Sequence, residues 1–429
     1  MDEEIEFYRE TEFKDTKIGK LPEEWEVRTL GEIGELSRGL SYRGHEKFAE
    51  EVSGSYLFLT LNSIKEGGGL RENGWSWIRT DRLRERHFVR EGDIVIANTD
   101  IGMQRGHILG APAIVYFPSW YRKDRAIYSH HISKLQLKTK LHPQFFFYYL
   151  SYVQPMARKY YTGTGVWGLD IDAWSNELSI SLPPLAEQRK ISEILSTVDE
   201  SIQKTDDIIA KTERLKKGLI QELLKRGIGH KEFKDTEIGK IPKEWEVMVA
   251  ADVADYINGY PFSPTDWKMH GIPIIRIQNL NDPNAEFNYF DGKIDDIYKI
   301  KNGDLLFSWS ASIGIHIWKG GDAVLNQHIF KVVPKANINK LFLYYDLLLA
   351  IEQLKSRVHG STMKHFQKNE LKTTFIPIPP LEEQQKIAEI LSTVDEKLET
   401  LKLEKAKLGR IKQWFMGELL SGRIRVRVA

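Results

Sequence analysis

Cysteine is absent from the sequence, which excludes structural disulfides and thiolate metal sites. No apolar run approaches the roughly 20 residues that cross a bilayer, and the acidic start, MDEEIEFYRE, lacks the hydrophobic stretch of a signal peptide. An excess of one charge is also missing, because 61 basic residues face 60 acidic ones. A local basic patch can survive such a balance. These absences predict a cytoplasmic protein with no membrane partner.

Signatures of catalysis are equally scarce. There is no G-x-x-x-x-G-K-[ST] phosphate loop, and no Asn/Asp-Pro-Pro-aromatic motif of amino-methyltransferases. GTGVWG at 163–168 has the letters of a dinucleotide fingerprint, but a predicted helix precedes it, so we expect a tight turn. His130 and His131 could suggest metal, yet only His131 has a counterpart, His328, and a buried or hydrogen-bonded histidine is favoured. The sequence predicts no catalytic residues and no metal site.

What the sequence does contain is an internal duplication. PPLAEQRKISEILSTVDE at 183–200 recurs as PPLEEQQKIAEILSTVDE at 379–396. EFKDTKIGKLPEEWEV at 12–27 recurs as EFKDTEIGKIPKEWEV at 232–247. The stretches between these constant segments match only faintly. A repeat of this size indicates two domains rather than a solenoid array.

The constant segments that follow each Pro-Pro pair are predicted to be long helices. Apolar residues recur at alternating steps of three and four, with Lys216 as an interruption, which is typical of a coiled coil. Gly227 and Gly422 are expected to end the two helices. Identical stripes are self-complementary about a two-fold axis, so we expect the helices to pack on each other rather than each on its own domain. The predicted packing residues are Leu195, Val198, Ile202, Ile209, Leu219, Leu391, Val394, Leu398, Leu408 and Phe415.

The divergent bodies have a different pattern. Short β-branched and aromatic runs such as SYLFLTLN, GDIVIAN, IPIIRIQNL and GDLLFSW alternate with Gly, Asn and Asp, which predicts strands and turns. One helix follows in each body. The fold class is therefore mixed α/β (α+β), with domain ranges predicted as 1–27, 28–180, 181–231, 232–247, 248–376 and 377–429.

A basic and aromatic segment lies in the first body. IRTDRLRERHFVR at 78–90 and WYRKDR at 120–125 combine arginines with nearby tryptophans and a tyrosine. Arginine binds phosphate in a bidentate way and reads guanine edges, whereas Asn and Gln suit adenine. A solvated charged face is the ordinary alternative, so this segment alone leaves the choice open.

The doubled IGKLPEEWEV/IGKIPKEWEV, the GTG/GST turns and the doubled PPL-helix segments, in this order and twice, resemble the specificity subunits of type I restriction-modification systems. The resemblance covers nearly the whole chain. It implies two target-recognition domains, each reading one half of a bipartite asymmetric DNA site, separated by an antiparallel two-helix coiled coil in a pseudo-two-fold arrangement. It implies a non-catalytic chain whose helices dock methyltransferase subunits. S-adenosylmethionine, ATP and Mg would be bound by those partners and by restriction/translocase subunits.

The resemblance does not transfer individual base contacts, so we infer them from the residues. The candidate DNA-binding residues are Arg38, Tyr42, Arg43, Asn62, Arg82, Arg84, Arg86, Gln104, Arg105, Lys123, Arg125, Tyr260, Gln278, Asn279, Lys319 and Lys364. Two other classes of function remain open, namely a stand-alone duplicated DNA-modifying enzyme and a DNA-free dimerising scaffold. The missing motifs argue against the enzyme, and unequal bodies on equal scaffolds argue against the pure scaffold.

Overall fold

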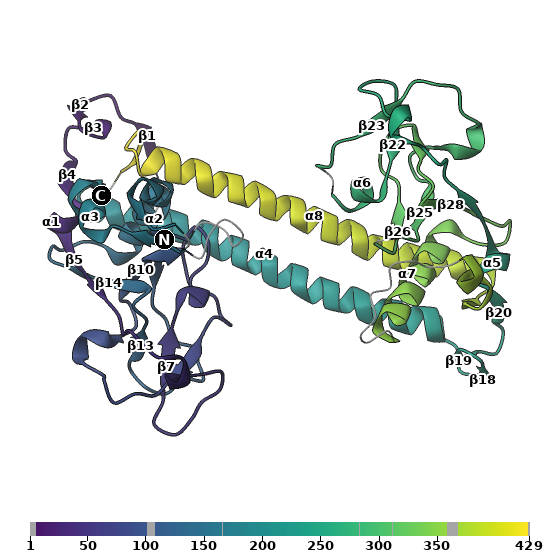
Figure 1. The fold of residues 1–429 in the computed structure, drawn as a ribbon, viewed down its shortest axis with the longest axis horizontal. Helices are drawn as coiled ribbons and strands as arrows, with labels where there is room; N and C mark the ends of the chain where they lie inside the picture. The colour runs from purple at the N-terminus through teal and green to yellow at the C-terminus, as the bar shows by residue number, and fades with distance from the viewer. Residues whose placement is uncertain are drawn as a thin grey trace. The chain divides into compact units, whose positions relative to one another are not determined.

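The computed structural model describes residues 6–100, 108–164, 166–282, 284–310, 312–357 and 368–427. The chain forms two compact units (Figure 1), the first made of residues 1–204 with 405–429 and the second of residues 205–404. Residues 405–429, assigned from the sequence to the distal helix of the second copy, therefore cluster with the N-terminal body. Both units are mixed α/β, as the fold-class prediction required.

The first unit is built on two main sheets. The four-stranded sheet has the order β12 (Pro112–Ile114), β10 (Ile94–Ala97), β14 (Ile132–Leu137) and β5 (Gly34–Arg38). The five-stranded sheet has the order β6 (Lys47–Phe48), β8 (Ser76–Ile78), β7 (Tyr56–Leu59), β13 (Ala126–Tyr128) and β9 (Phe88–Val89). Strands β7 and β13 pair in parallel, and the other pairs are antiparallel.

The second unit repeats this plan. Its first sheet has the order β21 (Ala254–Asn258), β28 (Ile329–Pro334), β25 (Leu305–Ser308) and β26 (Gly314–Ile317). Its second sheet has the order β23 (Asn288–Phe290), β22 (Ile272–Ile275), β27 (Ala323–Leu325) and β24 (Lys299–Ile300), with β22 and β27 parallel. The two bodies therefore share one arrangement of strands although their sequences match only faintly.

Smaller elements complete each unit. In the first they are β2 (Phe13–Thr16), β3 (Gly19–Pro22), β4 (Glu26–Thr29), α1 (Leu30–Ile33), β11 (Thr99–Asp100), α2 (Pro143–Val153), β15 (Tyr161–Thr162), β16 (Trp167–Leu169), α3 (Ile171–Glu177) and β17 (Ser179–Leu182). In the second they are β18 (Phe233–Thr236), β19 (Gly239–Pro242), β20 (Glu246–Val249), α5 (Ala250–Val253), α6 (Ile277–Asn281), α7 (Lys340–Arg357) and β29 (Phe375–Ile378).

Two of these elements bear on sequence predictions. The hairpin β2–β3 lies in the constant segment 12–27, and its counterpart β18–β19 lies in the repeat at 232–247. Each hairpin turns at a glycine with positive φ, Gly19 or Gly239. The GTGVWG stretch begins directly after the short strand β15, and its last two residues, Trp167 and Gly168, lie in β16, which pairs with β15. A strand before it and a strand after it do not form the strand-turn-helix unit of a dinucleotide site.

The long helices are α4 (Leu185–Arg226) and α8 (Leu381–Leu419). Each begins directly after its Pro-Pro pair, where a missing N–H removes no helical hydrogen bond. Gly227 and Gly422 follow them with φ of 66° and 73°, a left-handed conformation that glycine adopts without strain. All ten predicted packing residues are buried or half-buried.

In each unit the two helices run side by side and antiparallel (Figure 1). In the first unit, Asp199 of α4 lies 2.7 Å from Lys412 of α8. In the second unit, Lys216 of α4 lies 2.5 Å from Asp395 of α8. Higher numbers on one helix meet lower numbers on the other, which is the antiparallel order.

The hydrophobic core of each unit uses the start of one long helix and the end of the other. In the first unit, Ile191 and Leu195 of α4 join Leu419 in one buried cluster with α2 and β17. In the second, Ile387 and Leu391 of α8 join Leu224 in the equivalent cluster. Helix pairing and docking onto the unit therefore occur together, rather than as alternatives.

The chain ends of the first unit meet in a short sheet. β1 (Phe7–Arg9) pairs antiparallel with β30 (Ile424–Val426). From β30, buried Arg425 donates to both carboxylate oxygens of Glu187 at 3.0 and 2.9 Å, and Glu187 also accepts from Trp25 Nε1 at 3.2 Å. The pKa of Arg425 is raised, chiefly by its hydrogen bond to Glu187.

In the second unit His230 takes the place that Arg425 has in the first. Glu383, the counterpart of Glu187, accepts from Trp245 Nε1 at 2.9 Å and lies 2.9 Å from His230 Nε2. His230 belongs to the connection that joins α4 to β18. Arg425 in the first unit and His230 in the second thus each contact the glutamate near the start of a long helix. The repeats in the sequence do not reveal this correspondence.

Candidate nucleic-acid interface

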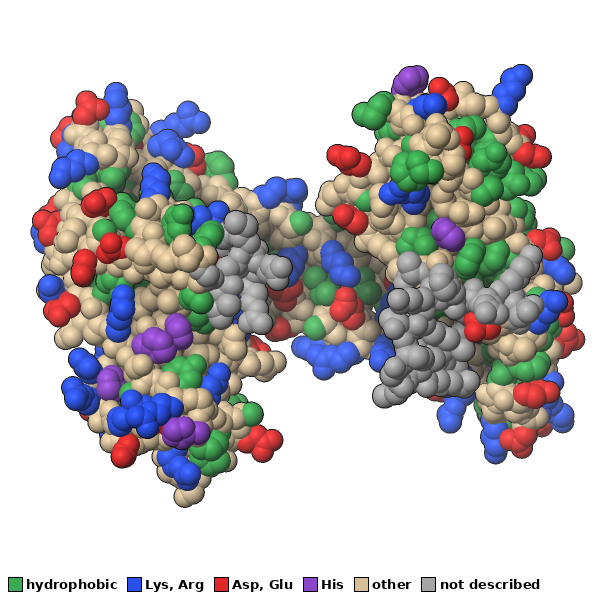
Figure 2. Space-filling view, viewed as in Figure 1, with side chains coloured by type: hydrophobic (Ala, Val, Ile, Leu, Met, Phe, Trp, Pro, Cys, Tyr) green, Lys and Arg blue, Asp and Glu red, His purple; other side chains and the backbone are tan. Residues whose placement is uncertain are grey.

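Basic side chains gather on the part of the first unit that holds β7 and β13 (Figure 2). Arg84 and Arg86 are exposed and flank the short 3-10 helix Glu85–His87. Arg82 is exposed as well, but its guanidinium lies 2.5 Å from the buried carboxylate of Glu46. Hydrogen bonds from Arg43 N, Thr80 and Arg82 lower the pKa of Glu46 to about 2. This pair fixes Arg82 in place while leaving Arg84 and Arg86 free of carboxylate partners among the described residues.

Two other predicted phosphate contacts are engaged within the unit. Lys123 donates to the carbonyl of Ser55 and lies over the ring of Tyr56 at 4.1 Å. Arg125 lies 3.0 Å from Glu85 and stacks over Phe88 at 4.0 Å. Their geometry fits a role in holding the loop at 120–125 against the five-stranded sheet.

The remaining predicted residues of the first unit lie near strand ends. Arg38 is exposed at the end of β5, and Arg43 is exposed shortly after it. Tyr42 is half-buried, with its ring edge-on to Phe58 at 5.0 Å. Asn62 is exposed on the 3-10 helix Leu61–Ser63 that follows β7.

In the second unit the structure revises one prediction. Gln278 and Asn279 belong to the strand-like run IPIIRIQNL of the sequence analysis but lie on the short helix α6. Asn279 is 8% exposed, and its amide is used by Arg276 N and by the carbonyls of Ala285 and Glu286. Asn279 therefore closes the turn instead of offering a free edge to adenine. Gln278 beside it is exposed.

The other predicted positions of the second unit vary. Tyr260 is half-buried against Phe262, with ring centroids 4.9 Å apart. Lys319 is exposed and lies 2.9 Å from Glu399 of α8. Gln104, Arg105 and Lys364 lie outside the described residues.

The structure also brings together polar residues that are not among the candidate DNA-binding residues. The last residue of β10 pairs with the first of β14, so Asn98 N donates to His131 O at 2.8 Å. Thr99 Oγ1 lies 3.0 Å from His131 Nδ1, and the ring centroids of His130 and His131 are 3.9 Å apart, with the rings tilted by 38°. Burial, with a smaller effect of His130, lowers the pKa of His131, which favours the neutral ring. The only signal in the sequence was the shared histidine, His131 and His328.

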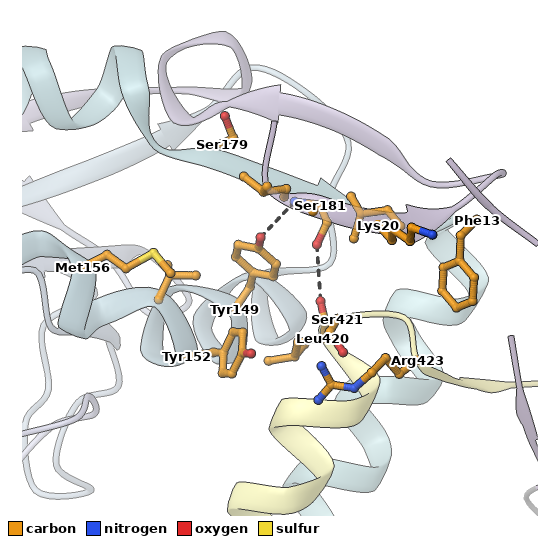
Figure 3. Close-up of a pocket in the computed structure, with 14 residues that line it drawn as sticks. Phe13, Lys20, Tyr149, Tyr152, Met156, Ser179, Ser181, Leu420, Ser421 and Arg423 are labelled. Carbon is orange, nitrogen blue, oxygen red and sulfur yellow. Dashed lines mark hydrogen bonds between the residues drawn. The ribbon is translucent and has the colours of Figure 1, made fainter. Parts of the chain in front are cut away.

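A groove of about 540 Å³ in the first unit has a different lining (Figure 3). Its apolar lining includes Ile18 of the constant segment 12–27, Tyr152 of α2 and Met156 of the 3-10 helix that follows α2. Within it Tyr149 Oη accepts a hydrogen bond from Ser181 N at 3.0 Å. The lining holds no pair of carboxylates and no nucleophile beside a base, so the groove does not have the arrangement of an acid–base or acyl-transfer site.

The second unit has a smaller cavity, about 70 Å³, at the equivalent position. Asp346 replaces Tyr149, and Pro377, which has no N–H, replaces Ser181. Asp346 is 4% exposed, and burial raises its pKa to about 8. Within the described residues no donor reaches this carboxyl, which is thus held mostly neutral near pH 7.

The described residues contain neither a cluster of metal ligands nor a helix suited to a membrane. No group of three or more His, Asp or Glu side chains is placed to bind a metal ion there. None of the helices in that part of the chain combines the length and apolarity of a membrane span.

Comparisons with known proteins agree with one another. Residues 22–214 and 242–410 match the family described as Type I restriction modification DNA specificity domain. The chain is 27% identical to the type I restriction enzyme MjaVIII specificity subunit of Methanocaldococcus jannaschii, over 99% of this chain and 98% of that protein. It is 28% identical to the putative MjaX specificity subunit of the same organism, over 99% of each.

Solved structures share the fold. The S subunit of a type I restriction-modification system from M. genitalium is 16% identical, with a TM-score of 0.55 over 92% of this chain and 96% of that one. A chain from a study of complex assembly and conformational transition of the type I R-M system is 19% identical, with a TM-score of 0.56 over 94% and 99%.

Proposed function

This chain belongs to the type I restriction-modification DNA specificity family, and we propose that it is the subunit that selects the DNA sequence of such a complex. Each unit would read one half of a bipartite, asymmetric site. The observation that carries the proposal is that one scaffold occurs twice with different residues on its surface loops. Two unlike readers on one chain suit a target whose halves differ.

Affinity would come from phosphate contacts and specificity from base contacts. Arg84 and Arg86, exposed on the first unit, are suited to phosphate, and Arg82 is oriented beside them by Glu46. Arg38, Arg43 and Asn62 of the first unit, with Tyr260 and Gln278 of the second, remain candidates for contacts in a groove. The argument for them is position at strand ends together with side-chain chemistry.

The reaction itself would belong to partners. Methyltransferase subunits would bind S-adenosylmethionine, and restriction/translocase subunits would bind ATP and Mg, all in the cytoplasm. Exposed apolar side chains on the long helices fit such docking, because exposed apolar surface often marks an interface. In the second unit they include Ile208, Leu215 and Leu403, the last 66% exposed, and in the first unit Trp414 is 53% exposed.

The test uses the chain reconstituted with its modification subunits. Methylation of a random-sequence duplex library, followed by sequencing, should return two short specified blocks separated by a fixed unspecified spacer. The isolated chain with S-adenosylmethionine should methylate nothing. Methylation by the isolated chain would favour a stand-alone enzyme, and a reconstituted complex without any sequence preference would favour a DNA-free scaffold.

A further inference from the structure

Three strand ends meet at one edge of the four-stranded sheet in each unit. In the first unit Arg38 ends β5 opposite Ser133 of β14, and Ala97 ends β10 opposite Ile132. In the second unit Asn258 ends β21 opposite Phe330, and Ser308 ends β25 opposite Ile329. Because neighbouring strands are about 5 Å apart, residues just beyond these ends form one contiguous surface.

The backbone connections at this edge are the same in both units. Asn98 N donates to His131 O at 2.8 Å, and its counterpart Trp309 N donates to His328 O at 3.2 Å. Gly39 N and Gly259 N donate to the carbonyls of Ile132 and Ile329 at 3.2 and 3.0 Å. A Cβ at either glycine would lie 2.2 Å from a carbonyl oxygen, so the close approach requires glycine. The backbone of this edge is therefore a fixed frame.

The side chains carried by this frame differ between the units. We call them the strand-end clusters: Arg38, Asn98, Thr99, His130 and His131 in the first unit, and Asn258, Trp309, Gln327 and His328 in the second. Only the histidine pair His131 and His328 is shared. A conserved backbone with exchanged polar side chains is what a reader of variable sequence needs.

Several polar atoms in the strand-end clusters lack partners within the described residues. They are Asn98 Oδ1, His130 Nδ1 and His328 Nδ1, all buried. Such atoms are uncommon in folded proteins, and each one invites a ligand or a specific explanation. In the second unit Trp309 Nε1 donates to Asn258 Oδ1 at 3.3 Å, and the Trp309 ring lies 5.2 Å from that of His328. Donors, acceptors and flat rings thus gather at one edge.

We propose that the strand-end clusters are the elements that read base edges, one cluster for each half of the target. The inference rests on the proposed function and assigns its specificity to named residues. Exposed Arg38 suits the two acceptors of guanine, and exposed Asn258 suits the donor and acceptor of adenine. Buried Asn98 is a positioning residue, since its Nδ2 donates to the carbonyl of His130 at 3.4 Å.

The experiment exchanges residues between the clusters in the full complex with its modification subunits. Arg38→Asn with His130→Gln places the side chains of the second cluster on the first frame, and Asn258→Arg with Gln327→His does the reverse. Each pair should change the preferred bases at one or two positions of one half-site by about 10- to 100-fold, measured by methylation of a random-sequence duplex library, and leave the other half-site unchanged.

Lys138→Ala is the matched control, because it removes one exposed cation at the opposite end of β14. It should leave both half-sites unchanged. If either exchange variant folds poorly by thermal melting, Arg38→Asn or Asn258→Arg alone carries the test, since both side chains are exposed. If the wild-type complex recognises a bipartite site and the folded variants keep the same base preferences, the inference is overturned and the proposed function is retained. Absence of any bipartite site in the wild type would overturn the proposed function instead.

Discussion

Lys216 of α4 lies 2.5 Å from Asp395 of α8, and Asp395 also accepts a hydrogen bond from Tyr345 Oη at 2.7 Å. The first unit contains the same three residue types. Asp199 lies 2.7 Å from Lys412 and accepts from Tyr148 Oη at 2.8 Å. Each Tyr–Asp–Lys triad joins both long helices to the helix beside them, α7 or α2. The triads therefore fix which turn of α4 faces which turn of α8.

Removing the lysine should weaken the second unit. Lys216→Met keeps the apolar stem but leaves Asp395, about one-third exposed, without its cation. We expect a loss of about 1–3 kcal/mol in the free energy of unfolding, as for a hydrogen bond to a charged group. Denaturant unfolding followed by helical circular dichroism gives the measurement, with the matched Lys402→Met as control.

Lys402 lies 3.1 Å from Glu213, but both side chains are more than half exposed, so its loss should cost less than about 1 kcal/mol. Equal effects of the two substitutions would contradict a special role for the triad.

The length of the paired helices should set the spacer between half-sites. Deleting residues 204–210 together with 401–407 removes seven residues from each helix and keeps both triads. Seven residues correspond to about 10 Å of helix, or about three base pairs. The tolerated spacer in the methylated library should shorten accordingly. A deletion complex that methylates efficiently with the original spacer would show that the paired helices do not set the spacer length.

Exposed and engaged basic residues should behave differently in salt. Arg84→Ala and Arg86→Ala should each weaken binding to all duplexes and reduce the slope of log affinity against log salt by about one. Lys123→Ala should leave that slope unchanged, because its ammonium is held by Ser55 O. Fluorescence anisotropy between 50 and 200 mM salt measures both. A slope that falls equally in all three variants would reject this distinction.

Asp346 should make the second unit less stable at alkaline pH. Its pKa is about 8 when folded, above the ordinary value of an unfolded aspartate, so the folded state binds the extra proton. Stability should fall as pH rises from about 4 to about 8, at up to about 1.4 kcal/mol per unit. The Asp346→Asn side chain cannot ionise, so the stability of this variant relative to the wild type should increase as the pH rises. Parallel unfolding profiles of the two proteins at pH 5, 7 and 9 would disprove the effect.

The helices were predictable from sequence because their signals are local. Pro-Pro pairs, a period of three and four, and the glycines Gly227 and Gly422 lie within each segment and gave the correct ends. The same pattern treated Lys216 as a break in the stripe. The spacing of apolar residues within α4 carries no information about Asp395, the residue on α8 that pairs with Lys216.

The candidate interface was less predictable because strand neighbours are distant in sequence. Thr99 and His131 are 32 residues apart in the sequence, and the described part of the chain between them includes β12 and β13. Asn279 was misplaced because the run IPIIRIQNL changes from strand to helix at its middle, where Arg276 N bonds to the Asn279 side chain. The role of Arg425 was hidden because only its position, not its residue type, matches His230.

The pairing of β1 with β30 has a consequence for synthesis. The second unit is one continuous stretch, 205–404, whereas the first needs residues 405–427 to supply Leu419, Arg425 and the strand that covers β1. The fold of the first unit therefore cannot be completed until the last residues of the chain are available. A chain truncated at residue 404 would leave apolar side chains such as Ile191 and Leu195 without part of their cover, and exposed apolar surface of this kind promotes aggregation.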